Sequence, residues 1–273
     1  MQCIFAYNRL ASSGLADLCI ALANMSTSPE PSDNPSNASS SAPLTVIMPA
    51  FNEEGVIRSA VEEVKKEVLD KVPGATLLVV NDGSKDQTAS ILDELAQNDS
   101  RLTVIHQVNR GHGPSLVRAM NEARGKYIFQ IDSDMQIPLN SFSQFWKMID
   151  SADAIFGVRS QRNDPAHRLY LSSLITFILG IIFKVDLPDS NVPFKIFRRQ
   201  IWQELQAKLA KETIVAPSIF LAIYAKTHKY KVMEVLVEHR ARTTGNPSLN
   251  VVSLARVAIK GFRQVIQFKD RLS

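Results

Sequence analysis

The sequence predicts an α/β fold in which a mostly parallel β-sheet carries helices on both faces. Short apolar runs rich in β-branched residues alternate along the chain with segments whose apolar residues recur at helical spacing. Polar loops containing Gly, Asn and Asp follow several of the strand-like runs. A chain of 273 residues with 45% hydrophobic content is also large enough to bury one full core. Alternating elements of these lengths imply right-handed crossovers and a sheet covered on both sides.

The expected strands and helices follow one another from residue 44 onward. Strands are expected at 44–48, 77–80, 102–105, 127–131 and 154–157, with a strand-like run at 231–237. The helices between the first four strands carry their apolar residues at helical spacing: Ile57, Ala60, Val61, Val64 and Val68, then Ala89, Leu92 and Leu95, then Leu116, Ala119, Met120 and Ala123. Ser84 and Gln87 match a capping box, which predicts that the second helix opens with them.

Composition and charge restrict the partners of the chain. The formal net charge of +4 and the pI of about 9.0 favour anionic partners such as phosphates or a lipid surface. No zinc-finger or RNA-binding signature is present, so we expect no nucleic-acid partner. Cys3 and Cys19 lie outside any expected core and form no CxxC pair, which favours a reducing, cytoplasmic compartment.

Composition also divides the chain into three parts. Residues 1–43 are expected to be a disordered extension, because residues 25–43 are rich in Ser, Pro and Asn and have almost nothing to bury. The apolar patch within the first 24 residues is too short and too polar for a membrane span, and we expect that segment to be dispensable. Residues 44–249 form the domain of alternating elements, and residues 250–273 form a basic amphipathic helix.

Two carboxylates, Asp132 and Asp134, directly follow the strand expected at 127–131. Ligands of open α/β sheets bind at the carboxyl ends of the strands, and a turn there allows both carboxylates to converge. Two oxygen ligands on a tight turn suit Mg²⁺ or Mn²⁺ that takes its other ligands from water and substrate phosphates. The alternative is an ordinary surface turn, since Asp and Ser are common turn residues.

Three further polar loops end at the same edge of the expected sheet. They are Pro49–Glu54, Asn81–Thr88 and Asn109–Gly113. Asp82 can accept hydrogen bonds from a base or a ribose hydroxyl, and Gly83 lets the backbone approach a flat ligand. Helix N-termini behind these loops favour phosphate. Four such loops on one edge, one of which carries a pair of metal-type ligands, indicate a nucleotide-phosphate site.

Together these motifs resemble the inverting glycosyltransferases of family 2, which have the Rossmann-like GT-A fold; the resemblance extends from about Leu44 to about Leu249. It implies that Asp82 lies at the donor base and that Asp132 and Asp134 bracket a divalent metal, Mg²⁺ or Mn²⁺, on the donor diphosphate. Gln136 matches a third metal-contacting position of dolichyl-phosphate mannose synthase-like members. The implied nucleotide-sugar site comprises Pro49, Asn52, Glu53, Glu54, Asp82, Gly83, Ser84, Gly111, Asp132, Ser133 and Arg159.

The second half of the chain is similar to the polyprenyl-phosphate sugar transferases of that family. The similarity is carried by 157–162, Arg168, Ser172 and 189–199. By position, basic residues in the last segment inherit the role of holding anionic phosphates, although a solvated charged face is an alternative for Arg198 and Arg199. The resemblance implies catalytic roles for Asp134, Asp189, Lys195 and Arg198, and acceptor contacts for Arg198 and Arg242.

The sequence departs from the family at three points. It lacks the Gln-x-x-Arg-Trp motif of the processive polysaccharide synthases, which argues against chain extension. Residues 246–248, Asn-Pro-Ser, stand where the lipid-phosphate enzymes usually have Glu-Ser-Lys. Residues 216–218, Ala-Pro-Ser, lack a carboxylate that many relatives have there, which weakens the case for a hydroxyl acceptor that needs a general base.

Two helical segments suggest a membrane surface. Residues 169–183 carry no charge and are shorter than a membrane span, so we expect 168–184 to lie in the interface, with the side formed by Leu171, Leu174, Ile178 and Ile182 in lipid. A core or dimer helix is the alternative. Residues 250–273 would add a second, basic contact, which makes the protein peripheral at the cytoplasmic membrane face.

We therefore expect an inverting, metal-dependent transfer of a sugar from a nucleoside-diphosphate sugar to a polyprenyl phosphate of the dolichyl or undecaprenyl type. A phosphate acceptor is already ionised, so no side chain has to remove its proton. A family 2 enzyme with a soluble or glycan hydroxyl acceptor is the alternative, with Asp189 as the nearby candidate base. A nucleotide-sugar-binding or nucleotidyltransferase protein is the second alternative, but it would need a Gly-rich basic signature near the first strand.

Overall fold

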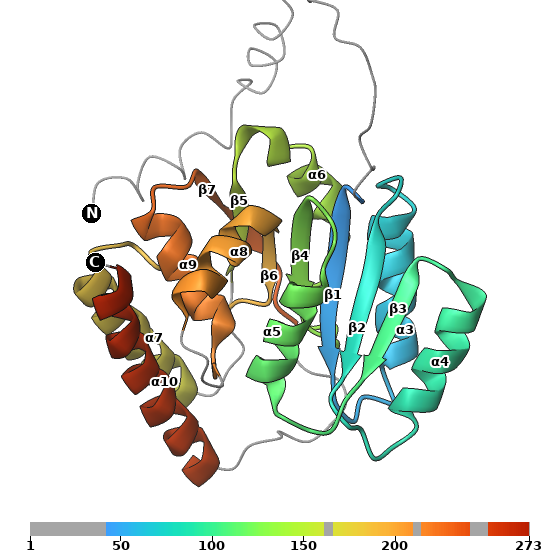
Figure 1. Cartoon of the computed structure of the whole chain (residues 1–273), viewed down its shortest axis with the longest axis horizontal. Coiled ribbons are helices and arrows are strands. Elements are labelled where there is room, and N and C mark those ends of the chain that lie inside the picture. The colour runs from blue at the N-terminus through green and yellow to red at the C-terminus, as the bar shows by residue number, and fades with distance from the viewer. Residues whose placement is uncertain (1–41, 161–165, 210–213, 241–250, 273) are drawn as a thin grey trace, which may run out of the picture. The chain divides into compact units, whose positions relative to one another are not determined.

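A computed structural model describes residues 42–160, 166–209, 214–240 and 251–272. Its centre is a seven-stranded sheet with the order β3-β2-β1-β4-β6-β5-β7 (Figure 1). The strands are β1 (Leu44–Ala50), β2 (Thr76–Asn81), β3 (Leu102–His106), β4 (Tyr127–Ile131), β5 (Ala154–Arg159), β6 (Phe194–Arg198) and β7 (Val232–Val237). The predicted α/β fold with a mostly parallel sheet is confirmed.

The sheet contains one strand that the sequence interpretation did not assign. β6 runs antiparallel to both of its neighbours, β4 and β5, whereas β3, β2, β1 and β4 pair in parallel, as do β5 and β7. In this register Ile131 at the end of β4 faces Phe194 at the start of β6. The carboxyl ends of β1–β5 and β7 and the amino end of β6 therefore share one edge of the sheet, which we call the rim.

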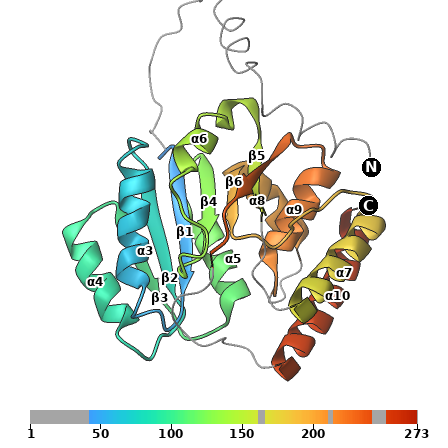
Figure 2. The same ribbon diagram turned by 180° about the vertical axis from the view of Figure 1, so that it is seen from behind.

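Helices cover both faces of the sheet and bury a core on each (Figures 1 and 2). One face is covered by α3 (Ile57–Val64), its π-helical continuation Lys65–Leu69, α4 (Thr88–Asn98) and α6 (Phe142–Trp146). The other face is covered by α5 (His112–Glu122), α8 (Arg199–Lys208) and α9 (Pro217–Thr227), beside which lie α7 (Ala166–Phe183) and α10 (Val251–Leu272). A short 3₁₀ turn, Ile149–Ser151, precedes β5.

The alternation of apolar side chains along the strands explains the two cores. On β1, Val46 and Met48 face the α3 side, while Ile47 faces the α5 side. All seven residues of β1 are buried, as expected for a parallel strand covered on both faces. This arrangement fixes the strand ends, and therefore the loops of the rim, along one edge of the sheet.

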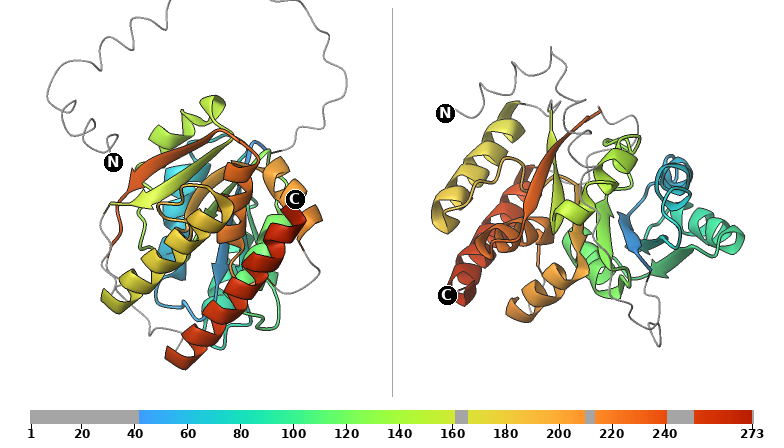
Figure 3. Two further views of the ribbon diagram at one scale, coloured as in Figure 1. Left: turned by 90° about the vertical axis from the view of Figure 1, so that its left-hand side faces the viewer. Right: turned by 90° about the horizontal axis from the view of Figure 1, so that it is seen from above.

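Helices α7 and α10 lie side by side at the β7 end of the sheet (Figure 3). Their Phe183 and Phe268 rings lie 6.4 Å apart. In the described part of the chain, no helix combines the length and the apolar character that crossing a membrane requires. Of residues 1–43, expected to be disordered, residues 1–41 lie outside the described residues, whereas Ala42 and Pro43 accept backbone hydrogen bonds from Lys126 and Tyr127 at 2.9 and 3.0 Å.

The exposed side of α7 differs from the one expected. Phe177 and Ile181 are 66% and 62% exposed, whereas Leu179 and Phe183 are buried in the core and Ile182 packs partly against it. The prediction that Ile178 and Ile182 form the outward apolar side is therefore wrong for Ile182. The core-helix alternative holds for one side of α7, because the sheet and α10 supply an apolar partner that the helix sequence alone does not reveal.

Candidate active site

The first two loops of the rim are fastened to each other by short polar side chains. The backbone N–H of Asn52 donates to Ser84 Oγ at 2.9 Å, and Asn52 Oδ1 accepts from the N–H of Lys85 at 2.8 Å. Ser84 Oγ in turn donates to Asn81 Oδ1 at 2.6 Å. Asn52 adopts the left-handed region with φ of 54°, which Asn tolerates better than most residues. These reciprocal bonds hold the loop after β1 against the loop after β2.

The same two loops are joined again further along. Glu54 accepts from the N–H of Gln87 at 2.9 Å, and its own N–H donates to Asp86 at 3.1 Å. Thr88 Oγ1 accepts from the N–H of Glu53 at 2.8 Å. Burial alone would raise the pKa of Asp86, but the donors from Thr88 and Glu54 lower it. This side of the rim is therefore preformed by hydrogen bonds.

The capping box predicted for Ser84 and Gln87 is wrong. Helix α4 begins at Thr88, and its N-cap residue Gln87 makes no side-chain capping bond. Ser84 is used by Asn52 and Asn81 instead. A long-range loop contact thus outcompetes the local motif.

Asp82 anchors the loop that follows β3. Its Oδ1 accepts from Gln107 Nε2 at 2.7 Å and from the N–H of Arg110 at 2.9 Å, and its Oδ2 accepts from the N–H of Gly111 at 2.8 Å. The residue is 2% exposed. Asp82 therefore lies in the rim as predicted, but its carboxylate holds the start of α5 in place. Gln107, which sequence reasoning missed, also donates to Ser115 at 2.9 Å and completes this connection.

Gly83 is required where the loops after β2 and β3 meet. Its φ is +71°, and a Cβ atom there would lie 2.7 Å from the backbone nitrogen of Asn109. Gly111 has φ of +93° and open space around it. The two glycines thus let the second and third loops pack closely and turn toward the rim.

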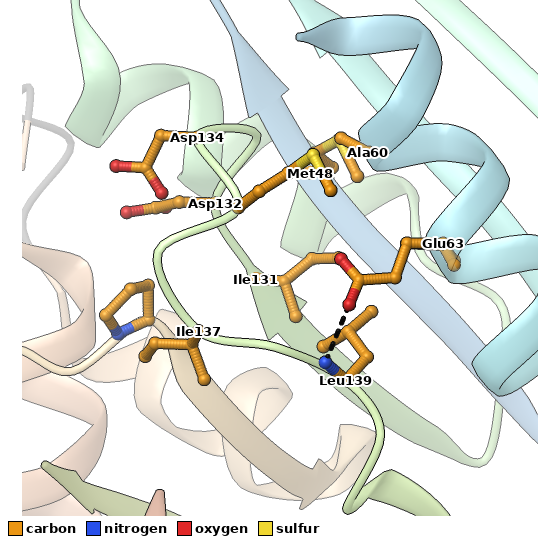
Figure 4. A pocket seen from close by; sticks show the side chains of 11 residues that line it. Met48, Ala60, Glu63, Ile131, Asp132, Asp134, Ile137 and Leu139 are labelled. Atoms are coloured by element: carbon orange, nitrogen blue, oxygen red, sulfur yellow. Dashed lines mark hydrogen bonds between the residues drawn. The ribbon is translucent and has the colours of Figure 1, made fainter. Parts of the chain in front are cut away.

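The acid turn, Asp132–Gln136, follows β4 at the centre of the rim. Asp132 and Asp134 direct their carboxylates to the same side of the turn, next to a cavity that Met48, Ala60 and Glu63 also line (Figure 4). Asp134 Oδ1 accepts from the N–H of Gln136 at 3.1 Å. Between them, Met135 adopts φ of +56°, which is strained for a side chain of this kind and is typical of functional sites.

The acid turn fits a divalent cation. Within the described residues, Asp132 Oδ1 is buried without a hydrogen-bond partner. Burial raises the pKa of Asp132, with Asp134 acting in the same direction, while His112, whose Nε2 lies 3.8 Å from Oδ1, acts against it. In the described ranges no cluster of three or more His, Cys, Asp or Glu could hold a metal. A cation held by this pair would therefore need water or substrate oxygens as further ligands.

Arg159 and Asp189 form a largely buried ion pair at the end of β5. The guanidinium donates to the carboxylate from Nε at 2.7 Å and from Nη2 at 2.9 Å. Burial raises the pKa of Asp189, but the arginine lowers it below its ordinary value. A carboxylate clamped in this way is a poor proton acceptor, so the structure argues against Asp189 as a general base.

Lys195 lies in the protein interior under the rim. It is fully buried on β6, beside Gln130 of β4 and Phe156 of β5, and its Nζ donates to the carbonyl oxygen of Val192 at 2.6 Å. Burial lowers the pKa of Lys195 to about 7, although Asp189 counteracts this. In this arrangement the ammonium fastens the segment between α7 and β6. It does not face an open acceptor site.

Arg198 lies at the edge of the sheet opposite the rim. It pairs in register with Tyr127, the first residue of β4, and its Nε donates to Asp153 at 2.9 Å. The guanidinium lies 5.2 Å from the centroid of the Tyr127 ring. The predicted catalytic and acceptor roles of Arg198 are therefore wrong in position, because antiparallel β6 carries its carboxyl end away from the rim. Arg242 lies outside the described residues.

The start of α9 lies near the start of α5 and carries no carboxylate. Ser218, the second residue of α9, is buried and exchanges two hydrogen bonds with Gln130 of β4, at 2.7 and 2.9 Å. Just before α9, the carbonyl oxygens of Ile214 and Val215 would lie within 2.5 Å of a Cβ atom at Gly113. The 214–218 segment is thus packed against β4 and α5 through uncharged groups.

Residues 45–235 match the family model described as glycosyl transferase family 2. The chain belongs to glycosyl transferase family 2.

The family 2 domain has two informative curated relatives. It is 23% identical over 214 residues to the undecaprenyl-phosphate 4-deoxy-4-formamido-L-arabinose transferase of Pseudomonas aeruginosa (strain LESB58), with 77% of this chain and 61% of that protein covered. It is 28% identical over 177 residues to the uncharacterized glycosyltransferase YkcC of Bacillus subtilis (strain 168), with 63% and 54% covered. The chain thus spans between 54% and 61% of the length of these relatives.

Solved structures confirm the expected GT-A-type α/β fold. Glucosyl-3-phosphoglycerate synthase from Mycobacterium tuberculosis, in complex with Mn²⁺, UDP-glucose and phosphoglyceric acid, matches with a TM-score of 0.62 and 17% identity, covering 83% of this chain and 79% of that chain. The mannosyltransferase PcManGT from Pyrobaculum calidifontis, in complex with GDP-Man and Mn²⁺, matches with a TM-score of 0.57 and 17% identity, covering 89% and 68%.

The structure brings together the predicted nucleotide-side residues of this family 2 domain on one rim. Residues from all four predicted loops lie there, and so do Arg159 and Asp189. Their roles stay predictions. Gln107 could have been found from its place directly after a strand, whereas the buried pairing of Gln130 with Ser218 leaves no signal in the sequence.

Proposed function

We propose that the chain transfers a sugar, with inversion, from a nucleoside-diphosphate sugar to a polyprenyl phosphate. The observation that carries the proposal is the acid turn: Asp132 and Asp134 converge in the middle of a rim whose neighbouring loops are preformed by hydrogen bonds. The loops after β1, β2 and β3 would bind the nucleoside diphosphate. Direct displacement at the anomeric carbon needs only positioning and stabilisation of the departing diphosphate.

Asp132 and Asp134 would hold a divalent cation, Mg²⁺ or Mn²⁺, between them and the donor diphosphate. When bound, such a cation neutralises the charge that develops on the leaving group. The Gln136 N–H, which donates to Asp134, holds the turn, and His112 Nε2 lies 3.8 Å from Asp132 Oδ1. Two solved neighbours are complexes with Mn²⁺ and UDP-glucose or GDP-Man, which supports this assignment.

A phosphate acceptor suits the groups at the end of β5 and at the start of α9. Within the described residues, Asp189 is clamped by Arg159, and the start of α9 carries Ser218 in place of a carboxylate. A hydroxyl acceptor requires a base within hydrogen-bond reach, whereas an ionised phosphate does not. The name of the Pseudomonas aeruginosa relative, an undecaprenyl-phosphate transferase, points to the same acceptor class.

The exposed apolar residues of α7 and α10 support a membrane surface as the place of the acceptor. Phe177 and Ile181 on α7, and Phe262 and Ile266 on α10, are one helical turn apart within each pair and exposed. Helix α10 also contains five Lys or Arg residues against one Asp. Aromatic and aliphatic side chains beside basic ones favour binding to an anionic lipid surface.

The transferase proposal is tested by thermal-shift screening of UDP-, GDP- and dTDP-sugars with Mn²⁺, followed by transfer of the radiolabelled sugar to polyprenyl phosphate. We expect one nucleotide to stabilise the protein only with the cation, and the label to move to the lipid. Transfer to phosphoglycerate or to a glycan in place of the lipid would overturn the acceptor class. Binding without transfer to any of these acceptors would favour a nucleotide-sugar-binding protein.

The membrane proposal is tested by flotation with vesicles that contain anionic lipid. The double substitution Phe177→Glu and Ile181→Glu should abolish co-flotation, because it places two charges on the apolar side of α7. Val108→Glu is the matched control, since Val108 is 74% exposed but lies just after β3, at the other end of the sheet. Equal flotation of both variants and the wild type would contradict the proposed contact.

A further inference from the structure

The acid turn is fastened to the end of β7 by one residue, Gln136. The carbonyl oxygen of Gln136 accepts from the N–H of Arg240 at 2.8 Å, and its side-chain Nε2 donates to the carbonyl oxygen of Arg240 at 3.2 Å. Both backbone groups of Arg240 are thus satisfied by the same residue, which lies 104 positions earlier in the chain. The contact therefore consists of one backbone hydrogen bond and one hydrogen bond from the side-chain amide.

The contact joins two parts of the rim that the sheet itself keeps apart. Gln136 follows β4 and Arg240 follows β7, and in the sheet these strands are separated by β6 and β5. The N–H of Gln136 also donates to Asp134 at 3.1 Å. Gln136 therefore contacts a cation-site carboxylate on one side and the end of the outermost strand on the other.

The side-chain amide has two chemically different ends. Its nitrogen can only donate and is directed at Arg240, while its oxygen can only accept. Within the described part of the chain, the amide oxygen makes no hydrogen bond. The tether to β7 and any contact with a cation thus use different atoms and can be separated by substitution.

We propose that Gln136 is a positioning residue that ties the acid turn to the β7 side of the rim through its amide nitrogen. Resting on the proposed function, this tether sets the distance between the donor diphosphate at Asp132 and Asp134 and an acceptor phosphate bound on the β5–β7 side. Direct displacement depends on this alignment, because even a small displacement of the acceptor phosphate from the anomeric carbon lowers the rate. The acceptor, more than the donor, depends on the tether.

Gln136→Glu separates the two ends of the side chain. The carboxylate keeps an oxygen where a cation could use it, but it removes the donor and turns an oxygen toward the carbonyl of Arg240. We expect Mn²⁺ affinity within about threefold of the wild type or tighter, and an acceptor KM raised about tenfold, because one hydrogen bond is lost and two acceptor oxygens face each other in its place. The donor KM should change much less.

Gln136→Met is the second variant, because it is neutral, similar in length and lacks both amide ends. It should raise the acceptor KM as Gln136→Glu does. Gln144→Glu is the matched control: Gln144 is exposed on α6, so it adds the same charge without touching the turn. The control should leave Mn²⁺ affinity and both KM values unchanged.

Hydrogen exchange of the peptide that contains Arg240 gives a readout that does not depend on sugar transfer. In the wild type, Mn²⁺ should slow the exchange of this peptide, because ordering the acid turn also orders its partner. In both Gln136 variants the Mn²⁺ effect should be weakened, because only the backbone bond from the Arg240 N–H to residue 136 remains, with melting temperatures close to that of the control. If the wild type shows this Mn²⁺ effect but does not transfer sugar to polyprenyl phosphate, the acceptor assignment is overturned and the tether still holds.

Two results would overturn the tether. The first is that both Gln136 variants weaken the binding of Mn²⁺ and of the donor, while the acceptor KM and the hydrogen exchange at Arg240 stay unchanged. Gln136 would then be a cation ligand only. The second is that Gln136→Met behaves like the control in every measurement, which would make the contact with Arg240 incidental.

Discussion

On the β1–β3 side of the rim, the loops are held by hydrogen bonds that short polar side chains exchange with backbone N–H groups, whereas on the β5–β7 side the interior holds charges. Asn52, Ser84 and Asp82 are typical of the first side. The Arg159–Asp189 pair and fully buried Lys195 are typical of the second. These hydrogen bonds preform the loops, as the proposed nucleotide site requires. Buried charges instead make the second side sensitive to any change of ionisation.

Asp134 lies in the acid turn, between the β1–β3 and β5–β7 sides of the rim, and its substitution should have the largest effect on sugar transfer. Asp134→Ala removes one of the two converging carboxylates, and we expect the rate of sugar transfer to fall about 1,000-fold, as for the loss of several kcal/mol of transition-state stabilisation. Transfer rates and Mn²⁺ titrations measure the effect. An unchanged rate would refute the acid turn as the catalytic centre. Asp150→Ala, an exposed aspartate in the turn before β5, is the control.

Removing one partner of the buried ion pair should destabilise the β5–β7 side. Asp189→Asn leaves the guanidinium of Arg159 without its carboxylate, and the free energy of unfolding should drop by about 3–5 kcal/mol. Asp153→Asn, at the more exposed pair with Arg198, whose side chains are 31% and 32% exposed, should cost only about 1 kcal/mol. Urea denaturation of both variants compares them. Equal losses would mean that burial does not distinguish the two pairs.

A matched pair of glycine substitutions examines the β1–β3 side. Gly83→Ala should lower the free energy of unfolding by about 1–3 kcal/mol and weaken nucleotide binding, because a positive φ and a Cβ contact of 2.7 Å with Asn109 N both oppose it. Gly55→Ala meets no atom within 4 Å and should change stability by less than about 0.5 kcal/mol. If Gly83→Ala is also neutral, the second and third loops are not as tightly packed as described.

Substitution of Lys195 should cause a smaller change in stability, and this change should depend on pH. Its folded pKa of about 7 lies below its ordinary value, so between about pH 7 and 10 the unfolded chain holds a proton that the folded protein has lost. The stability of the wild type relative to Lys195→Met should therefore rise through this window, by at most about 1.4 kcal/mol per pH unit, and stay constant below it. Unfolding midpoints at pH 6, 7.5 and 9 measure the slope. A flat difference would show that Lys195 stays charged when buried.

The β1–β3 side was largely predictable, because its motifs are local. Pro49–Glu54 and Asn81–Ser84 directly follow apolar runs, and parallel strands bring their carboxyl ends together. The capping box failed because Ser84 has a better partner 32 residues away. The outward side of α7 was misassigned because burial of Leu179 and Phe183 depends on α10 and on the sheet beside it.

By itself, the sequence determined the α/β order of elements, the polar loops at the strand ends and the pair of carboxylates after β4, because hydrophobic periodicity and turn residues are local properties. Only the tertiary structure decided the direction of β6, which removed Arg198 from the rim, and the partners of Asp189 and Asp82. It also decided the contact between Gln136 and Arg240. Strand direction and long-range pairing depend on how all elements bury their surfaces together, and no short stretch of sequence contains that information.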